Sequence, residues 1–210
     1  MKNLIIVGAG DFGREVLDWA LAIPEKKRDW NVVGFLDDNP DALTSYDTGL
    51  EILGCTSTYK PQKNDVFVIA IGEPASRKKI ARLLAERGGT FTQVIHPSAV
   101  IGSRCKLGIG TIICPRVVIT TDIHIGDFVI LNVASSIGHN SVIGDFCTVS
   151  PHCAIMGHGT IEPEVFFGVC AHCVPNITIE RGAIVGAGST VYRRVEKYST
   201  VFTTPAKKLK

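Results

Sequence analysis

The chain has 210 residues, and its 22 basic side chains nearly balance its 20 acidic ones. This balance argues against a nucleic-acid partner and against a polybasic membrane anchor, because both need a clear surplus of Lys and Arg. The apolar start of the chain is too short for a secretory signal, and no later apolar run approaches the roughly 20 residues of a membrane span. We therefore expect a soluble, cytoplasmic protein without membrane insertion.

Residues 1–95 alternate between strand-like and helix-like segments. Apolar runs that end in glycine or turn residues indicate buried strands, and apolar residues at helical spacing indicate helices. Strands are expected over 3–10, 30–38, 65–72 and 90–96, and helices over 11–23 and 73–88. This alternation predicts a small parallel α/β sheet, so residues 1–95 form the first expected domain.

From about residue 97 a six-residue period replaces this pattern, and residues 96–210 form the second expected domain. Every sixth position carries an apolar side chain, namely Ile101, Leu107, Ile113, Ile119, Ile125, Leu131, Ile137, Ile143, Val149, Ile155, Ile161, Phe167, Cys173, Ile179, Val185 and Val191. The position two residues before each of these carries a small or β-branched side chain. Such a period is typical of a hexapeptide β-helix, in which three hexapeptides form one triangular coil. Both sets of side chains are expected to point inward.

The register places His139 two positions after Ile137, at a corner of the expected coil and outside its packed interior. Residues 18 apart stack at roughly the 4.8 Å spacing of strands, so we expect Gly157 over His139 and His158 over Asn140. A corner imidazole can take a proton from an attacking amine or hydroxyl, and a glycine N–H can hold an oxyanion. The alternative is a surface histidine without a role, and the register does not decide between the two.

The segment GAGDFG at residues 8–13 follows an expected strand and precedes an expected helix. It matches the G-x-G-x-x-G fingerprint of dinucleotide-binding folds. Asp37 or Asp38, at the end of the next strand, can bind a ribose hydroxyl, so an NAD-binding site is one interpretation. The other is a tight turn between strand and helix that binds no ligand.

Histidine and cysteine occur together in the segments HC and CAHC, as in some zinc sites. The register argues against a metal, because Cys147, Cys153 and Cys173 fall in inward slots, where thiols behave as small hydrophobes. His152 falls at a corner and His172 on an outward face, so these imidazoles do not converge with the sulfurs. We therefore expect no metal.

Several segments in combination resemble the hexapeptide acyltransferases of the sialic acid O-acetyltransferase NeuD and nucleotide-aminosugar N-acetyltransferase PglD type. The resemblance covers essentially the whole chain: IIVGAGDFGREV, VVGFLDDNP, AIGEPASRKKI, VIHPSAVIG, SIGHNSVIGDFCTVSPHCAIMGH, AIVGAGSTVYRRV and TPAKKLK. It implies a Rossmann-like N-terminal domain, a left-handed parallel β-helix and a homotrimer. It also implies that acetyl-CoA lies between neighbouring β-helices, while a sugar or nucleotide-sugar acceptor reaches in from the N-terminal domain.

The resemblance also implies roles for single residues. His139 becomes the general base, Asn140 takes the position of its partner, and the backbone N–H of Gly157 becomes the oxyanion donor. The implied acetyl-CoA contacts are Gly157, His158, Gly168, Gly186, Ala187, Pro205 and Lys207. The implied acceptor contacts are Gly8, Gly10, Asp11, Phe12, Gly13, Asp37 and Asp38. On this interpretation the glycine loop receives the phosphates or sugar of the acceptor, because N–H groups at a helix start suit phosphate.

Two of the departures from the family pattern bear on the base and on the acceptor. Asn140 stands where the family has Glu or Asp, so the partner of His139 can accept the Nδ1 proton but brings no charge. Asp122 and Asp145 are candidates to supply the missing carboxylate. Asp11 and the residue after it stand where the family has Gly-His, which leaves the acceptor open because a carboxylate repels phosphate.

We therefore predict an acetyl-CoA-dependent acyltransferase that acetylates an amino or hydroxyl group of a nucleotide-linked sugar, with a histidine as general base. The family context is polysaccharide biosynthesis. One alternative is a non-catalytic trimeric scaffold or nucleotide-sensing protein, whose degenerate site Asn140 would mark. Another is an NAD-binding regulator that does not respond to acetyl-CoA.

Overall fold

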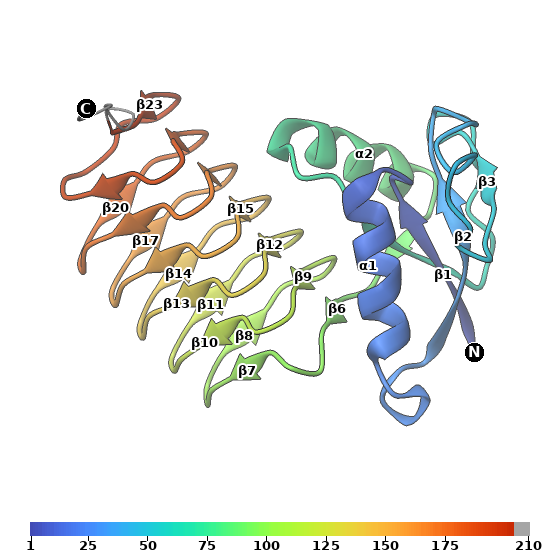
Figure 1. The fold of residues 1–210 in the computed structure, drawn as a ribbon, viewed down its shortest axis with the longest axis horizontal. Helices are drawn as coiled ribbons and strands as arrows, with labels where there is room; N and C mark the ends of the chain where they lie inside the picture. The colour runs from blue at the N-terminus through green and yellow to red at the C-terminus, as the bar shows by residue number, and fades with distance from the viewer. Residues whose placement is uncertain (204–210) are drawn as a thin grey trace, which may run out of the picture.

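The computed structural model of the protein describes residues 1–203 (Figure 1). A Rossmann-like α/β unit adjoins a left-handed parallel β-helix that extends to the end of the described chain, so the predicted fold class is confirmed. Within residues 1–203, neither α-helix has the length and apolar character that a membrane span requires.

The N-terminal unit contains one parallel sheet with the strand order β3-β2-β1-β4-β5. Its strands are β1 (Lys2–Val7), β2 (Trp30–Leu36), β3 (Ile52–Gly54), β4 (Asp65–Ile69) and β5 (Thr90–Phe91). The helices are α1 (Asp11–Ala22) and α2 (Pro74–Glu86), and a short 3₁₀ turn, η1 (Glu25–Lys27), follows α1. Both predicted helices and the first three predicted strands are present, and the predicted strand over 90–96 is split into β5 and a two-residue strand of the β-helix. β3 was not predicted because its three residues lack a visible period.

Alternation along β1 explains why a helix covers each face of this sheet. Leu4 and Ile6 pack in one apolar cluster with residues of α1. Ile5 and Val7 pack in a second cluster with residues of α2. Successive side chains of a strand point to opposite faces, so the all-apolar run of β1 requires cover on both sides.

The β-helix consists of three parallel sheets of two-residue strands. The seven-stranded sheet contains β6 (Val94–Ile95), β9 (Ile112–Ile113), β12 (Ile130–Leu131), β15 (Thr148–Val149), β18 (Phe166–Phe167), β21 (Ile184–Val185) and β23 (Thr200–Val201). The six-stranded sheet contains β7 (Val100–Ile101), β10 (Val118–Ile119), β13 (Ser136–Ile137), β16 (Ala154–Ile155), β19 (His172–Cys173) and β22 (Thr190–Val191). The five-stranded sheet contains β8 (Lys106–Leu107), β11 (His124–Ile125), β14 (Val142–Ile143), β17 (Thr160–Ile161) and β20 (Thr178–Ile179).

The six-residue period is confirmed by the strand pairing. Ile119 pairs with Ile137, and Ile137 pairs with Ile155, so each inward residue lies on the residue 18 positions away. These side chains are buried, and the small positions between them are buried as well from Thr111 onward. Ile101, in the first coil, is 37% exposed, because that coil has a neighbour on one side only.

The coils turn at residues in the left-handed region of the backbone. Thirteen described residues other than glycine have φ between 56° and 68°, among them Asn140 and His158. This conformation is unfavourable for most side chains and least so for Asn and Asp.

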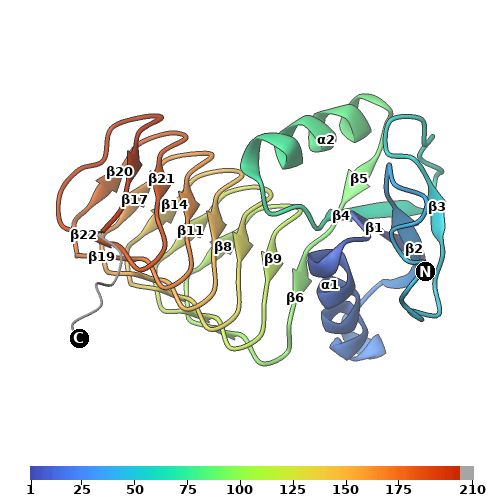
Figure 2. The same ribbon diagram turned by 45° about the horizontal axis from the view of Figure 1, so that its top comes forward.

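Helix α2 lies against the outer face of the seven-stranded sheet, as Figure 2 shows. The rings of Phe91 and Phe128 meet edge to face at 4.8 Å, and Phe146 stacks on Phe128 at 5.0 Å. The two units therefore share one packed junction. β6 pairs with β9 within the β-helix, and the division into domains between residues 95 and 96 stays a prediction.

Candidate active site

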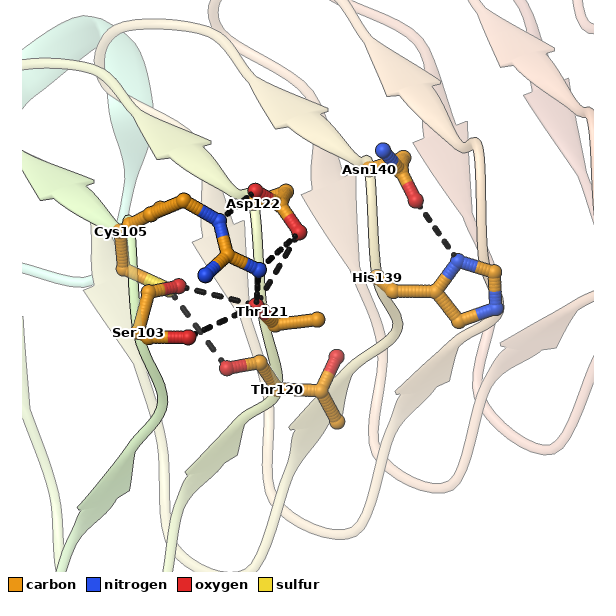
Figure 3. A network of polar contacts seen from close by, with 8 residues as sticks. Ser103, Cys105, Thr120, Thr121, Asp122, His139 and Asn140 are labelled. Atoms are coloured by element: carbon orange, nitrogen blue, oxygen red, sulfur yellow. Dashed lines mark hydrogen bonds and ion pairs between the residues drawn. The ribbon is translucent and has the colours of Figure 1, made fainter.

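The candidate base lies at the corner between β13 and β14. His139 and Asn140 are both exposed there, and Nδ1 of His139 lies 2.9 Å from Oδ1 of Asn140 (Figure 3). An amide oxygen can only accept a hydrogen bond, so this contact assigns the proton to Nδ1. Nε2 is then left with a free lone pair, which is the state that a general base requires.

The coil above leaves the imidazole edge open. A Cβ atom at Gly157 would lie 2.7 Å from Cε1 and 2.8 Å from Nε2 of His139, so any larger residue would press against the basic nitrogen. The backbone N–H of His158 donates to the carbonyl oxygen of His139 at 2.8 Å, and the two imidazole rings meet edge to face at 5.1 Å. The predicted stacking of the two coils is therefore confirmed.

Both candidate replacement carboxylates have other partners. Asp122 binds the guanidinium of Arg104, with 2.9 Å between Oδ2 and Nη2 (Figure 3). The hydrogen bond from Arg104 lowers the pKa of Asp122, so it is ionised at neutral pH. Asp145 accepts a hydrogen bond from the backbone N–H of Asp127 at 2.8 Å. The observed partner of His139 is therefore the neutral amide of Asn140.

The residues expected to contact acetyl-CoA divide between two corners. Gly157 and His158 lie beside His139, whereas Gly168, Gly186 and Ala187 lie at the corner that follows the seven-stranded sheet. Pro205 and Lys207 lie outside the described residues.

The stacking of the coils explains why glycine occupies two positions of the second corner. A Cβ at Gly168 would lie 2.6 Å from the backbone nitrogen of Ala187. A Cβ at Gly186 would lie 2.6 Å from Cβ of Phe202. The close approach of the next coil thus requires glycine at both positions, whatever ligand lies outside.

The glycine loop before α1 has the geometry of a tight strand-to-helix turn. Gly8 has a φ of 99°, and a Cβ at Gly13 would lie 1.9 Å from the carbonyl oxygen of Gly8. Asp11 pairs with Arg14, whose guanidinium stacks 3.5 Å from the centre of the Tyr46 ring. Neither the cationic side chain of Arg14 nor the aromatic side chain of Tyr46 was predicted from the sequence to lie beside the loop.

The remaining predicted acceptor residues make contacts within the unit. Asp37 accepts the backbone N–H of Ala9 at 2.7 Å and that of Asn39 at 2.9 Å. Asp38 accepts from the backbone N–H of Thr56 and the thiol of Cys55. The ring of Phe12 packs against Trp19 with 5.8 Å between centroids. Asp37 therefore braces the glycine loop and Asp38 the turn at Cys55 and Thr56, which weakens the interpretation that one of them holds the ribose of NAD.

The cysteines predicted to fill inward slots are buried in the β-helix core. Burial raises the pKa of the Cys147 thiol to about 12 and of the Cys153 and Cys173 thiols to about 11. Residues 1–203 contain no group of three or more His, Cys, Asp or Glu side chains arranged to hold a metal ion.

Sequence reasoning missed Arg77, which is completely buried between α2 and the β-helix. It accompanies Ala81 and Leu84 on the buried stripe of α2. The available signal was that Arg77 lies at helical spacing from the apolar residues of this stripe. A charged side chain on a buried stripe is seldom without partners, so this position indicated a contact with another element.

A hexapeptide β-helix with a histidine at a coil corner, its Nδ1 hydrogen-bonded and its Nε2 facing a glycine, defines an acyltransferase of the β-helix class. Residues 3–84 match the family described as the PglD N-terminal domain. GDP-perosamine N-acetyltransferase from Escherichia coli O157:H7 is 32% identical over 191 residues, which cover 87% of this chain and 82% of that protein. The chain therefore belongs to the PglD/NeuD-type family of acetyltransferases.

Solved structures agree with this placement over nearly the full length. PerB from Caulobacter crescentus, in complex with CoA and GDP-perosamine, has a TM-score of 0.87 and 28% identity, covering 99% of this chain and 97% of its own. The acetyltransferase domain of PglB from Neisseria gonorrhoeae has a TM-score of 0.86 and 25% identity, and each chain covers 100% of the other. That domain is also known in complex with acetyl coenzyme A. The protein is accordingly an acetyltransferase.

Proposed function

We propose that the protein transfers the acetyl group of acetyl-CoA to the amino group of a sugar carried on a nucleoside diphosphate. The observation that carries this proposal is the His139 corner, where Asn140 fixes the tautomer and Gly157 leaves the basic nitrogen accessible. An amine is favoured over a hydroxyl because GDP-perosamine N-acetyltransferase and UDP-N-acetylbacillosamine N-acetyltransferase are both relatives of this chain.

In the proposed reaction the acceptor nitrogen attacks the thioester carbonyl carbon, a C–N bond forms and the C–S bond breaks. Nε2 of His139 takes the proton that the nitrogen loses and passes it to the departing CoA thiolate. The backbone N–H of Gly157 donates to the oxyanion of the tetrahedral intermediate. Atoms balance as an amide and a free CoA thiol, and the imidazole returns to its neutral form.

The acceptor is proposed to bind at the glycine loop. Gly10 and Gly13 bring backbone N–H groups to the start of α1, where phosphate is favoured, and Gly8, whose N–H donates to the carbonyl oxygen of Leu36, lets the chain turn into the helix. Arg14 supplies a cation beside this loop, which offsets the unfavourable charge of Asp11. In this proposal Phe12 and Asp37 shape the loop through Trp19 and the backbone of Ala9, and Asp38 holds the neighbouring turn at Thr56.

We also propose that the working form is a homotrimer located in the cytoplasm. An exposed corner covers a CoA molecule on one side only, so a neighbouring β-helix is needed to complete the groove. Gly168, Gly186, Ala187, Pro205 and Lys207 stay the proposed contacts to the rest of CoA. In this arrangement residues 1–95 hold the acceptor and residues 96–210 hold the acetyl donor.

The test is release of free CoA thiol from acetyl-CoA with GDP-perosamine and a small panel of UDP- and dTDP-linked amino sugars. A general base contributes about 10²–10⁴ in rate, so His139→Ala is expected to lose that factor in kcat. A loss below about tenfold would remove His139 from the base role. Measurable CoA binding without transfer to any acceptor would instead support the non-catalytic scaffold.

A further inference from the structure

The side chain of Arg77 joins the two units of the molecule. It is fully buried in α2, at 0% exposure, where the helix meets the β-helix. Its guanidinium donates to the carbonyl oxygens of Ile71, Gly72, Phe128, Phe146 and Cys147 and to Oγ1 of Thr148, at 2.6–3.1 Å. One planar group therefore holds the loop after β4 and two successive coils at the same time.

All these acceptors of Arg77 are neutral oxygens. Burial lowers the pKa of Arg77 to about 10, so the side chain is still a cation at neutral pH. A buried charge is expensive to desolvate, and apolar side chains of similar volume often hold two surfaces together at least as well. Holding the two surfaces together therefore does not by itself explain an arginine at this position. The planar guanidinium, with its donors in fixed directions, also sets the relative orientation of the segments that it binds.

The coil that Arg77 holds is the one that carries the catalytic corner. Phe128 and Phe146 are stacked residues of adjacent coils, 18 positions apart, and Arg77 binds the carbonyl oxygen of each. The chain between them runs once around the prism and passes through His139. Both ends of the turn that presents the base are therefore fixed to α2.

The other side of Arg77 leads to the glycine loop. Its Nη1 binds the carbonyl oxygens of Ile71 and Gly72, and the Thr148 hydroxyl donates to the Gly72 oxygen at 2.6 Å. A Cβ at Gly8 would lie 3.0 Å from the carbonyl oxygen of Ala70 and 3.3 Å from Cγ1 of Ile71. The loop after β4 is thus in contact with the loop proposed to bind the acceptor.

We infer that Arg77 is a positioning residue for acetyl transfer: it fixes the distance and angle between the acceptor loop and the coil that carries His139. This inference rests on the proposed function, because it takes the glycine loop as the acceptor site. Misplacing reacting groups by about 1 Å can cost about 10²-fold in rate. Loss of Arg77 therefore reduces the rate of the ternary complex and leaves the binding of each ligand alone unchanged.

The experiment compares wild type with Arg77→Met and Arg77→Lys, using Arg82→Met as the matched control on the exposed side of the same helix. GDP and CoA binding are measured by calorimetry, and kcat is measured with acetyl-CoA and GDP-perosamine and normalised to CoA-binding sites. We expect Arg77→Met to bind GDP and CoA as wild type does, with kcat lower by about 10²-fold. Arg77→Lys should recover part of the loss, and Arg82→Met should match wild type.

A kcat of Arg77→Met within threefold of wild type would overturn the inference, and so would a loss of activity that merely follows a loss of bound GDP or CoA. Should Arg77→Met not fold, Thr148→Val serves instead, because it removes the hydroxyl that links Gly72 to Arg77 while keeping the side-chain volume. An unchanged kcat in a folded Thr148→Val protein would then overturn it. Wild type that binds both ligands yet transfers nothing to GDP-perosamine or any other acceptor would refute the proposed function itself.

Discussion

The two units of the molecule distribute their contacts in opposite ways. In the β-helix a residue meets the residues 18 positions before and after it, as His139 meets Gly157. In the α/β unit one side chain links segments that are far apart in the chain, as Arg77 links residues 71 and 148. A change in the β-helix should therefore act within one or two coils, whereas a change at the junction should alter how two ligands meet.

The largest expected effect tests how local the β-helix is, with two glycines on adjacent coils. Gly157→Ala places a methyl group against the movable His139 ring, so we expect kcat to fall by about 10²-fold with little change in stability. Gly138→Ala places its methyl group 2.5 Å from the backbone nitrogen of Gly157, which cannot swing away. Thermal unfolding should then show a loss of roughly 1–3 kcal/mol for Gly138→Ala. Equal stability of the two variants would contradict this picture.

The second prediction asks whether a negative charge beside His139 would make acetyl transfer faster. Asn140→Asp keeps the acceptor for Nδ1 of His139 and adds a carboxylate that stabilises the imidazolium, so kcat should rise by about tenfold. Asp is preferred to Glu here because residue 140 has a φ of 60°, which Asn and Asp tolerate best. Steady-state kinetics with matched Asn140→Ala, expected to be slower than wild type, measures the effect. A variant with Asp that is no faster would show that the neutral partner is sufficient.

The third prediction compares exposed and buried thiols. Cys170 is exposed at a coil corner, whereas burial keeps the pKa of Cys147 at about 12. Because the thiolate is the reactive form, a disulfide reagent at pH 8 should modify Cys170 within minutes and Cys147 only after unfolding. Mass spectrometry of the labelled peptides measures the order. Rapid labelling of Cys147 in the folded protein would mean that the coils open.

The smallest expected effect concerns the exposed ion pair of Arg104 and Asp122, on the coil below His139. Arg104 lowers the pKa of Asp122 from its usual 3.8, so the pair stabilises the folded state above that pH. This stabilisation is lost as the pH falls through the lower folded-state pKa. Asp122→Asn should therefore be slightly less stable than wild type at pH 7 in urea, with the difference shrinking as the pH falls below 3.8. A difference that persists in acid would point to a cause other than this ion pair.

The difference between local contacts in the β-helix and distant contacts in the α/β unit also explains which features could be predicted from the sequence. The period that runs through Ile119, Ile137 and Ile155 placed every corner of the β-helix, and with it the contact between His139 and Gly157. Repeats make this possible, because each contact depends only on a fixed spacing in the chain.

In the α/β unit the strands and helices could be predicted from the sequence, but the hydrogen-bond partners of its polar side chains could not. Asp37 accepts hydrogen bonds from the backbone N–H groups of Ala9 and Asn39, which the sequence did not reveal, and its contact with a ligand stays a prediction. The role of Arg77 depends on which coil α2 reaches, and no local pattern encodes that distance. Such contacts follow from the tertiary arrangement, so a single sequence leaves them undetermined.

Arg77 binds the β-helix at one particular coil, the one between Phe128 and Phe146. The number of coils beyond this contact can therefore change without moving the coil that Arg77 holds. Duplicating an 18-residue coil after residue 149 would lengthen the prism and leave His139 where it is relative to α2. The same duplication before residue 128 would displace His139 from the N-terminal α/β unit by roughly 4.8 Å, the spacing of one strand. Insertions that natural variation or design can accept are thus confined to the far side of this anchor, in whole coils.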